Sequence, residues 1–221
     1  EGGIGRLIAP SALPLPEAVD ALVAPYLDVI RALNEPGRLA FYPGSPLVAR
    51  MLLRPEDRLV VNELHPQDRA SLDAELGRDK AVTVMGLDAW VAVKALLPPP
   101  ERRGLVLIDP PYEQPDEWDK AIAAVAEVRK RFATGVLMLW YPIKVSGEHR
   151  RVEELLRRDQ TLKAIVAEVT IRPEVEARGL NGSGLLIVNP PWTLMKELER
   201  LLPFLAERLA QRPGGGYRLE M

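Results

Sequence analysis

Cysteine is missing from this 221-residue sequence. Its absence excludes disulfides, zinc–thiolate sites and cysteine nucleophiles. Histidine is scarce as well: His65 and His149 make two, too few for a typical histidine-rich site, so we expect no metal centre. A cytoplasmic enzyme or binding protein fits this composition best.

Long apolar runs and a strong net charge are also missing. No stretch reaches the length of a membrane span, and the N-terminus lacks the layout of a signal peptide, so we expect no membrane association. A net charge of −2 argues against a protein that coats nucleic acid, but not against one that binds it through a local patch. Basic clusters occur, and neighbouring acids favour interpreting them as solvated helix faces; they lie at 102–103, 129–131, 144, 149–151 and 157–158.

Alternation of strand-like and helical patterns dominates the chain. Aliphatic segments at 57–64, 81–90, 103–112 and 134–143 are each followed by a helical pattern. This rhythm is typical of an α/β fold with a mostly parallel, doubly wound sheet. Before it, a helical stretch with proline interruptions covers residues 1–37. We predict one domain over residues 1–221, with a helical insertion or cap at about 1–56 and the sheet core at 57–221.

The last two strand-like segments, 162–171 and 182–192, are about ten residues apart. That connection is too short for a crossover helix, so the two strands are predicted to be antiparallel. Asn181, Gly182 and Gly184 are interpreted as hairpin-turn residues. A final helix at about 193–211 ends at a glycine-rich tail.

Proline is abundant, with 21 residues, and two Pro-Pro pairs end similar aliphatic runs: "LVLIDPPYEQ" at 105–114 and "LLIVNPPWTL" at 185–194. An acid or amide before Pro-Pro-aromatic at a strand end suits chemistry on an exocyclic amine of a nucleobase. Ligands of open parallel sheets bind outside the carboxyl ends of the strands. We therefore expect Asp109 to face the site. The antiparallel strand ending at Asn189 points the other way, so Asn189 is interpreted as part of a structural turn in which Trp192 packs the last helix.

Two more acids follow the expected strands of the same sheet. Glu63 can accept both hydroxyls of a ribose, and Asp88 can accept from an adenine amino group. Each has an alternative interpretation as a strand-end or helix-capping acid. Together with Asp109 they fit the adenosyl part of S-adenosylmethionine beside an amine-methylating site.

The chemistry explains these residue types. Asp109 and the carbonyl of Pro110 can accept the two hydrogens of adenine N6, which favours a tetrahedral nitrogen with its lone pair aimed at the methyl group. The prolines stiffen the loop, so the acceptors are preorganised. Tyr112 is expected to stack on an extruded base. Positioning for in-line transfer would supply most of the catalysis, and the scheme requires no metal.

Five segments, in the same order and spread over essentially the whole chain, resemble the RlmJ family of bacterial 23S ribosomal RNA adenine-N6 methyltransferases: "YPGSPLVARMLLR", "NELHP", "GLVLIDPPYE", "RFATGVLMLWYP" and "GSGLLIVNPPW". The resemblance implies a Rossmann-like class I methyltransferase fold, S-adenosylmethionine as cofactor and 23S ribosomal RNA as partner. It implies that Asp109 is catalytic. It also implies that Ser45, Glu63, Asp88 and the backbone of Ala89 contact the cofactor, although relatives tend to carry glycine at position 89.

The family carries several dozen further residues before the point that matches Glu1, including the first strand of the sheet. We therefore expect the sheet of these 221 residues to lack that strand. Two alternatives remain open: a DNA amino methyltransferase, although no separate region for sequence readout is evident, and a non-catalytic RNA-binding protein on the same fold. No obligatory protein partner is expected.

Overall fold

The structure, a computed structural model, describes residues 3–8, 14–173 and 179–221. The chain divides into two compact units: unit 1 covers residues 3–95 and unit 2 covers residues 96–221. The predicted boundary at residues 56 and 57 does not coincide with this division, and the single domain over residues 1–221 stays a prediction. Within the described residues, no helix has the length and apolar character needed to cross a membrane.

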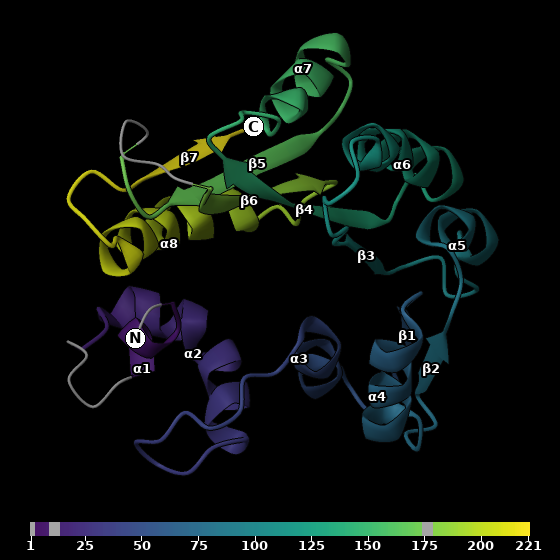
Figure 1. Ribbon diagram of the computed structural model, residues 1–221, viewed down its shortest axis with the longest axis horizontal. Helices are drawn as coiled ribbons and strands as arrows, with labels where there is room; N and C mark the ends of the chain where they lie inside the picture. Colours follow the sequence, from purple (N-terminus) through teal and green to yellow (C-terminus); the bar gives the residue numbers. More distant parts are fainter. Residues whose placement is uncertain (1–2, 9–13, 174–178) are drawn as a thin grey trace. The chain divides into compact units, whose positions relative to one another are not determined.

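Unit 1 is built from helices and one short parallel strand pair (Figure 1). Its elements are α1 (Gly5–Ile8), α2 (Glu17–Ala32), α3 (Ser45–Leu52), β1 (Leu59–Asn62), α4 (Pro66–Leu76), β2 (Val82–Met85) and most of α5 (Ala89–Leu96). β1 and β2 pair in parallel with α4 as the crossover, which is the expected strand–helix–strand unit.

α2 forms around one apolar stripe. Val19, Val23, Leu27 and Ile30 recur at three- and four-residue spacing, and all are buried. The helix continues through Pro25, because burial of this stripe outweighs the one backbone hydrogen bond that proline removes. The expected helical character of the N-terminal region is thus confirmed for this helix, while residues 9–13 lie outside the described residues.

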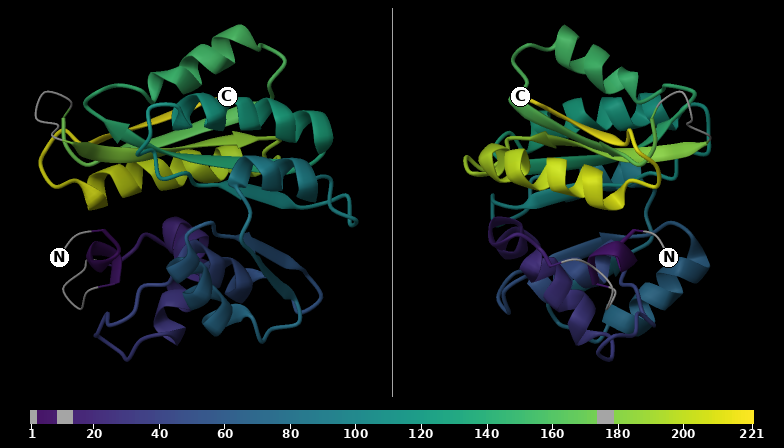
Figure 2. Two further views of the ribbon diagram at one scale, coloured as in Figure 1. Left: turned by 45° about the vertical axis from the view of Figure 1, so that its right-hand side comes forward. Right: turned by 90° about the vertical axis from the view of Figure 1, so that its left-hand side faces the viewer.

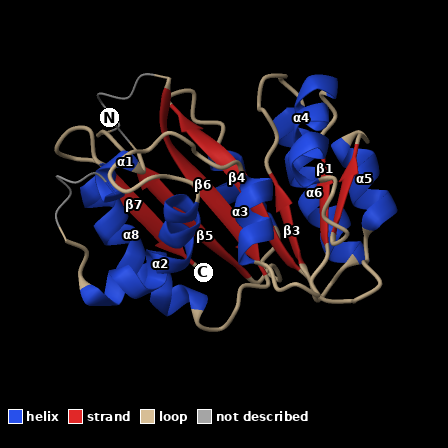
Figure 3. Ribbon diagram, turned by 90° about the horizontal axis from the view of Figure 1, so that it is seen from below, coloured by secondary structure: helices blue, strands red, loops and turns tan. Residues whose placement is uncertain are grey.

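Unit 2 contains a five-stranded sheet in the order β3-β4-β6-β5-β7 (Figure 3). Its elements are β3 (Leu105–Ile108), α6 (Glu117–Arg131), β4 (Val136–Lys144), α7 (Arg150–Arg158), β5 (Ala164–Thr170), β6 (Leu180–Val188), α8 (Leu194–Leu209) and β7 (Gly216–Glu220). β3 and β4 are parallel, whereas β6 is antiparallel to both β4 and β5, as the short connection predicted. β7 adds an antiparallel edge strand beside β5.

Helices cover both faces of this sheet, with α8 on one face and α6 and α7 on the other (Figure 2). On the α8 side, Leu198 and Leu202 pack with Ile165, Ala167 and Ile187 of β5 and β6. Buried residues of α6 supply the opposite side: Trp118, Ala121, Ala124, Val125 and Val128. This two-sided burial confirms the α/β class and the doubly wound arrangement within unit 2.

Three expectations need correction. β1 and β2 form one sheet and β3 belongs to the other, since within the described residues β3 pairs with neither β1 nor β2. The three strand-end acids, Glu63, Asp88 and Asp109, therefore do not follow strands of a single sheet. The glycine-rich tail continues into β7, whose pairing partner β5 is distant in sequence. Asn181, Gly182 and Gly184 lie inside β6 rather than in a turn.

The two glycines of β6 are required by close packing. A Cβ on Gly182 would lie 2.1 Å from the carbonyl oxygen of Val169, and one on Gly184 would lie 2.3 Å from the ring of Tyr141. Glycine in a strand often marks such close approach, which local turn statistics do not distinguish from a hairpin.

Candidate active site

The Asp-Pro-Pro-Tyr motif leaves β3 at its carboxyl end. Ile108 and Pro110 are buried, whereas Asp109 between them is exposed on one side. Partial burial of the Asp109 carboxyl raises its pKa above the ordinary aspartate value, because water solvates the charge incompletely. A carboxylate with a raised pKa is a stronger acceptor for an amine hydrogen. The structure therefore gives Asp109 both access and basicity.

Tyr112 supports this loop from inside. Its hydroxyl donates to the carbonyl oxygen of Trp140 in β4 at 2.8 Å, and its ring lies 4.5 Å from that of Trp118. Burial, with the charges of Asp109 and Glu117, raises the pKa of the Tyr112 hydroxyl, which keeps it protonated as a donor. The side chain is only 6% exposed, so the expected stacking surface for a base is covered in this structure.

Backbone strain marks the same position. Tyr112 has φ +54°, in the left-handed region that non-glycine residues seldom adopt. Such conformations persist where the surroundings hold them, and they occur often at functional sites. Here the surroundings are the hydrogen bond to Trp140 and the ring contact with Trp118.

Glu117 was not among the predicted site residues. One of its carboxylate oxygens, Oε2, accepts from the backbone N–H of Glu113 at 2.6 Å and of Gln114 at 3.1 Å. This side chain, in the first turn of α6, therefore fixes the chain directly after the motif. An acid near the start of a helix is a recognisable capping signal, although the sequence does not reveal which amides it reaches.

In unit 1, Glu63 and Asp88 follow neighbouring parallel strands. The paired end residues of β1 and β2 are Asn62 and Met85. The amide of Asn62 donates to the carbonyl of Leu87 at 2.8 Å and accepts from the Leu87 N–H at 2.9 Å, which ties the two strand ends together. The structure thus brings Glu63 and Asp88 to one edge of this sheet, as parallel pairing predicted.

Both carboxylates have local partners. A Glu63 oxygen accepts from the backbone N–H of His65 at 2.7 Å. Asp88 Oδ1 accepts from the N–H groups of Trp90 at 3.0 Å and Val91 at 3.1 Å, at the start of α5. The helix-capping interpretation of Asp88 is therefore correct. Its other oxygen, Oδ2, has no such bond in the described part of the chain, so capping and ligand binding are compatible.

Ser45 and Ala89 occupy matching positions. Ser45 is the first residue of α3, Ala89 is the first residue of α5, and both are exposed. The first N–H groups of a helix have no partner within the helix, and they suit anionic or polar ligand atoms. Ala89, which stands where relatives tend to carry glycine, keeps the backbone N–H at this position.

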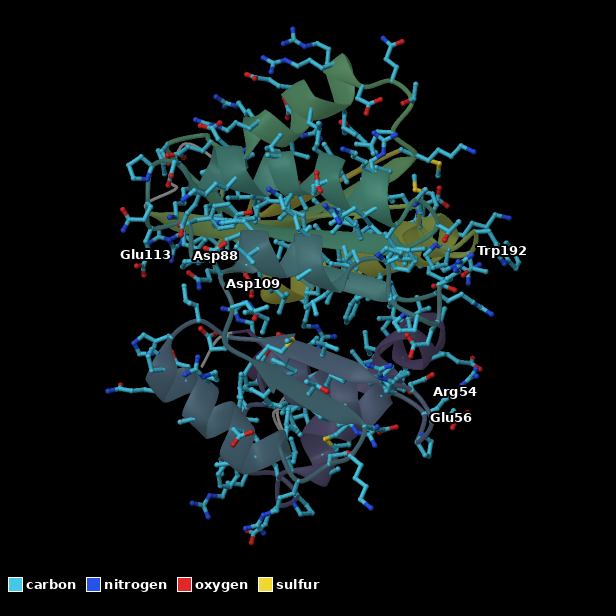
Figure 4. All side chains as sticks on the ribbon, turned by 90° about the vertical axis from the view of Figure 1, so that its right-hand side faces the viewer. Arg54, Glu56, Asp88, Asp109, Glu113 and Trp192 are labelled. Atoms are coloured by element: carbon cyan, nitrogen blue, oxygen red, sulfur yellow. The ribbon has the colours of Figure 1, made fainter. Side chains whose placement is uncertain are left out.

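The second Pro-Pro motif lies at the other end of the unit 2 sheet. Asn189 Nδ2 donates to the carbonyls of Ala133 and Gly135, both at 2.9 Å, and these residues precede β4. The structural role and the opposite edge predicted for Asn189 are confirmed; Figure 4 shows Asp109 and Trp192 at opposite ends of unit 2. Trp192 is 90% exposed, so the prediction that it packs the last helix is wrong.

The reason is that Trp192 precedes α8. The buried residues of this helix are Leu198, Leu202 and Ala206, and Leu194 and Met195 of its first turn also pack against the core. The surface that meets the sheet therefore begins after the Trp192 ring. Elsewhere in unit 2, a cavity of about 700 Å³ between α8 and β7 contains none of the predicted site residues.

The predicted residues fall into two sets. Unit 2 carries Asp109, Pro110 and Tyr112, and unit 1 carries Ser45, Glu63, Asp88 and Ala89. Within the described residues, no group of three or more potential metal-ligating side chains occurs. The donor sets suit amine chemistry in unit 2 and polar contacts to a nucleoside in unit 1.

Comparison with known proteins identifies the chain. A family model described as "Ribosomal RNA large subunit methyltransferase D, RlmJ" matches residues 1–221. The chain belongs to the RlmJ family. The Haemophilus influenzae "Ribosomal RNA large subunit methyltransferase J" is 41% identical over 219 residues, which cover 99% of this chain and 76% of that relative. The Escherichia coli protein of the same name is 39% identical over 207 residues, 94% of this chain and 72% of the relative.

Solved structures share the fold of this chain. A Legionella pneumophila protein matches with a TM-score of 0.82 and 35% identity, over 93% of this chain and 74% of that one. A probable spermidine synthase from Corynebacterium glutamicum matches with a TM-score of 0.54 and 16% identity, over 93% of this chain and 75% of that one, and shows a shared fold alone. This RlmJ-family chain is therefore an RNA methyltransferase with a Rossmann-like α/β fold.

Proposed function

We propose that this chain transfers a methyl group from S-adenosylmethionine to adenine N6 of 23S ribosomal RNA, with Asp109 as the catalytic residue. The observation that carries the proposal is an accessible aspartate of raised pKa at the carboxyl end of β3, in a member of the RlmJ family. The names of the relatives specify large-subunit ribosomal RNA, and the motif supports an amine as acceptor. We place the reaction in the cytoplasm.

The residues of unit 1 fit the cofactor by their chemistry. The Glu63 carboxylate suits the two hydroxyls of a ribose, and the free oxygen of Asp88 suits an adenine amino group. Ser45 and Ala89 present the first N–H groups of α3 and α5. S-adenosylmethionine, when bound, supplies the electrophilic methyl group.

The residues of unit 2 act on the amine. In the proposed reaction the Asp109 carboxylate and the Pro110 carbonyl accept the two N6 hydrogens, which favours a tetrahedral nitrogen and localises its lone pair instead of leaving it delocalised into the ring. Formation of the nitrogen–carbon bond would break the sulfonium–methyl bond and leave the cofactor as its thioether. The amine would then lose one proton, and a carboxylate of raised pKa is suited to accept it. Preorganised acceptors stabilise this arrangement more than water does, because they need no reorientation.

Tyr112 and Glu117 are proposed as positioning residues. Tyr112 fixes one end of the loop through Trp140, and Glu117 fixes the other end through two backbone amides. Both keep Asp109 and Pro110 in one geometry. The stacking partner of the base must then be another side chain, since the Tyr112 ring is covered.

The proposal is tested with the complete gene product, labelled S-adenosylmethionine and protein-free 23S ribosomal RNA that lacks its native modifications. We expect labelled N6-methyladenosine from the parent, and a rate reduced at least about a hundredfold in Asp109→Ala. Asp116→Ala is the matched control, because Asp116 is an exposed acid close by that pairs with Lys120.

Undiminished transfer by Asp109→Ala would overturn the catalytic assignment. Duplex DNA is assayed in parallel. Methylation of that DNA without methylation of the RNA would overturn the substrate and favour a DNA amino methyltransferase.

A further inference from the structure

A loop in unit 1 exposes large apolar side chains. It covers residues 34–42 between α2 and α3, and we call it the aromatic loop (Figure 1). Phe41 is 68% exposed, Tyr42 is 63% exposed and Leu39 is 42% exposed. Single exposed apolar residues are common, but adjacent exposed aromatic residues in one short segment indicate an interaction surface.

The aromatic loop is held in a fixed shape by Asn34. Its Nδ2 donates to the carbonyls of Ile30 and Phe41, both at 2.8 Å. Its Oδ1 accepts from the backbone N–H of Ala40 at 2.7 Å and of Phe41 at 2.8 Å. One side chain thus joins the end of α2 to the backbone on either side of Phe41, so the exposed ring does not result from a loosely attached segment.

Tyr42 is fixed separately. Its hydroxyl and that of Tyr26 on α2 are 2.7 Å apart and hydrogen-bonded. The next residue, Pro43, is buried and restricts the backbone where the loop leaves for α3. A surface that is already ordered loses little conformational entropy when a ligand binds.

The aromatic loop also carries a cation. Arg38 in the loop is exposed and has no ion-pair partner in the described part of the chain. Many arginines of unit 2 pair with acids: Arg129 with Asp159, Arg131 with Glu127, Arg151 with Asp119 and Arg158 with Glu154. These four side chains have acids beside them, as the solvated-face interpretation expects, whereas Arg38 keeps its charge available, as do Arg102 and Arg103 of unit 2.

We propose that the aromatic loop is a stacking platform for unpaired bases of the substrate RNA. Single-stranded RNA is recognised by aromatic rings that stack on splayed bases, with arginine beside them for phosphate or base contacts. Phe41 supplies the open ring, Tyr42 a second ring anchored at its hydroxyl, and Arg38 the charge. The inference rests on RNA being the substrate of this family member, but not on the identity of the catalytic residue.

The test measures the dissociation constants of the complete gene product for a single-stranded adenine-containing oligoribonucleotide and for protein-free 23S ribosomal RNA, at one salt concentration. All variants carry Asp109→Ala, so that binding is measured without turnover. We expect Phe41→Ala to weaken binding about tenfold and Arg38→Gln to weaken it severalfold. Phe41→Trp should restore or strengthen binding, because stacking needs a ring and not a particular side chain.

Two controls separate stacking from general surface effects. Glu35→Gln alters the acid of the same loop, and Trp192→Ala removes the exposed aromatic ring of unit 2. Neither is expected to weaken RNA binding. Circular dichroism and thermal midpoints of all variants should match those of the parent, which excludes misfolding as the cause.

Parent-like RNA affinity of Phe41→Ala would overturn the inference, and so would failure of Phe41→Trp to bind better than Phe41→Ala. Self-association of the parent that Phe41→Ala abolishes, with RNA affinity unchanged, would instead identify a protein-binding surface. Failure of the proposed methylation would appear as absent transfer by the chain with Asp109 intact, and would leave this binding test unaffected.

Discussion

Asp109 illustrates how a single residue depends on its surroundings. The sequence identifies it through the Asp-Pro-Pro-Tyr motif, and any exposed aspartate could accept a hydrogen bond. What raises its pKa is partial burial at the end of β3, where the next residue is a buried proline. The role proposed for this residue therefore carries a cost in stability, because an ionised carboxylate is poorly solvated there.

This cost predicts how stability changes with pH. Folding raises the pKa of this carboxyl above its value in the unfolded chain. The resulting stabilisation is fully present at pH values below the pKa of the unfolded chain, and it is lost as the pH rises through the pKa of the folded chain. Asp109→Asn is therefore expected to increase the free energy of unfolding near pH 7.5, with a gain that shrinks as the pH falls toward the ordinary aspartate value of about 3.9. Urea unfolding at several pH values measures it.

Asp116→Asn is the control for that series. The hydrogen bond from Lys120 lowers the pKa of Asp116, so its ionised form favours the fold and its replacement should give no gain at any pH. An equal gain in both variants would show that a general charge effect, and not burial of Asp109, is responsible.

Among the elements, β4 connects the candidate site to the core. The carbonyl of Trp140 anchors Tyr112, while the next residue, Tyr141, is fully buried and donates to Glu168 Oε1 on β5 at 2.7 Å. Arg218 on β7 lies 3.8 Å from the other oxygen of Glu168. The C-terminal edge strand thus supplies a cation to a buried carboxylate that also accepts a hydrogen bond from β4.

Tyr141→Phe is expected to destabilise the protein by about 1–3 kcal/mol, because it leaves Glu168 Oε1 buried without its donor. The free energy of unfolding in urea is the measurement. Tyr217→Phe, which removes the hydroxyl of a half-exposed tyrosine on β7, should change that free energy by less than about 0.5 kcal/mol. Equal effects would contradict the role assigned to the buried bond.

A second prediction at this scale concerns the backbone amides of the aromatic loop. Asn34→Ala removes the acceptor of the Ala40 and Phe41 amides, so both should exchange with deuterium at least about tenfold faster. Amide exchange followed by NMR or mass spectrometry measures this. The amides of Val23 and Leu27 in α2 serve as internal reference, since their helix is held by its buried stripe. Unchanged exchange at Ala40 and Phe41 would show that other contacts hold the loop.

For the whole molecule, charge is balanced: 29 basic and 31 acidic residues give a net charge of −2. Four arginines of the basic clusters of unit 2 are paired with acids. Attraction to RNA must then come from a few local contacts and not from the overall field of the protein.

This balance predicts a weak dependence of RNA binding on salt. Each phosphate contact with a single strand contributes a slope of about −0.7 to log affinity against log salt concentration. With about five contacts or fewer, we expect a slope no steeper than about −3.5 for the oligoribonucleotide. Titrations at several potassium chloride concentrations measure it. A much steeper slope would show that a broad basic surface binds the RNA.

Most of the strands and helices, the Asp-Pro-Pro-Tyr motif and the family resemblance are evident in the sequence alone. Strand and helix positions follow from short-range periodicity, which each segment carries within itself. Antiparallel pairing of β5 and β6 follows from the length of one connection. That pairing in turn predicts that Asp109 and Asn189 lie at opposite edges of the sheet. The catalytic and cofactor-binding residues stay predictions, and they too are local, since they depend on residue types at strand ends.

Features that depend on contacts between distant parts of the sequence become visible in the folded chain. It paired β7 with β5, divided the strands between two sheets and placed Gly184 against the Tyr141 ring. It covered Tyr112 and exposed Trp192, two aromatic residues after Pro-Pro that local sequence treats alike. Burial depends on which elements pack around a side chain, and that information is spread over the whole chain. The motif therefore predicts the chemistry, while packing determines which of the two aromatic side chains is exposed.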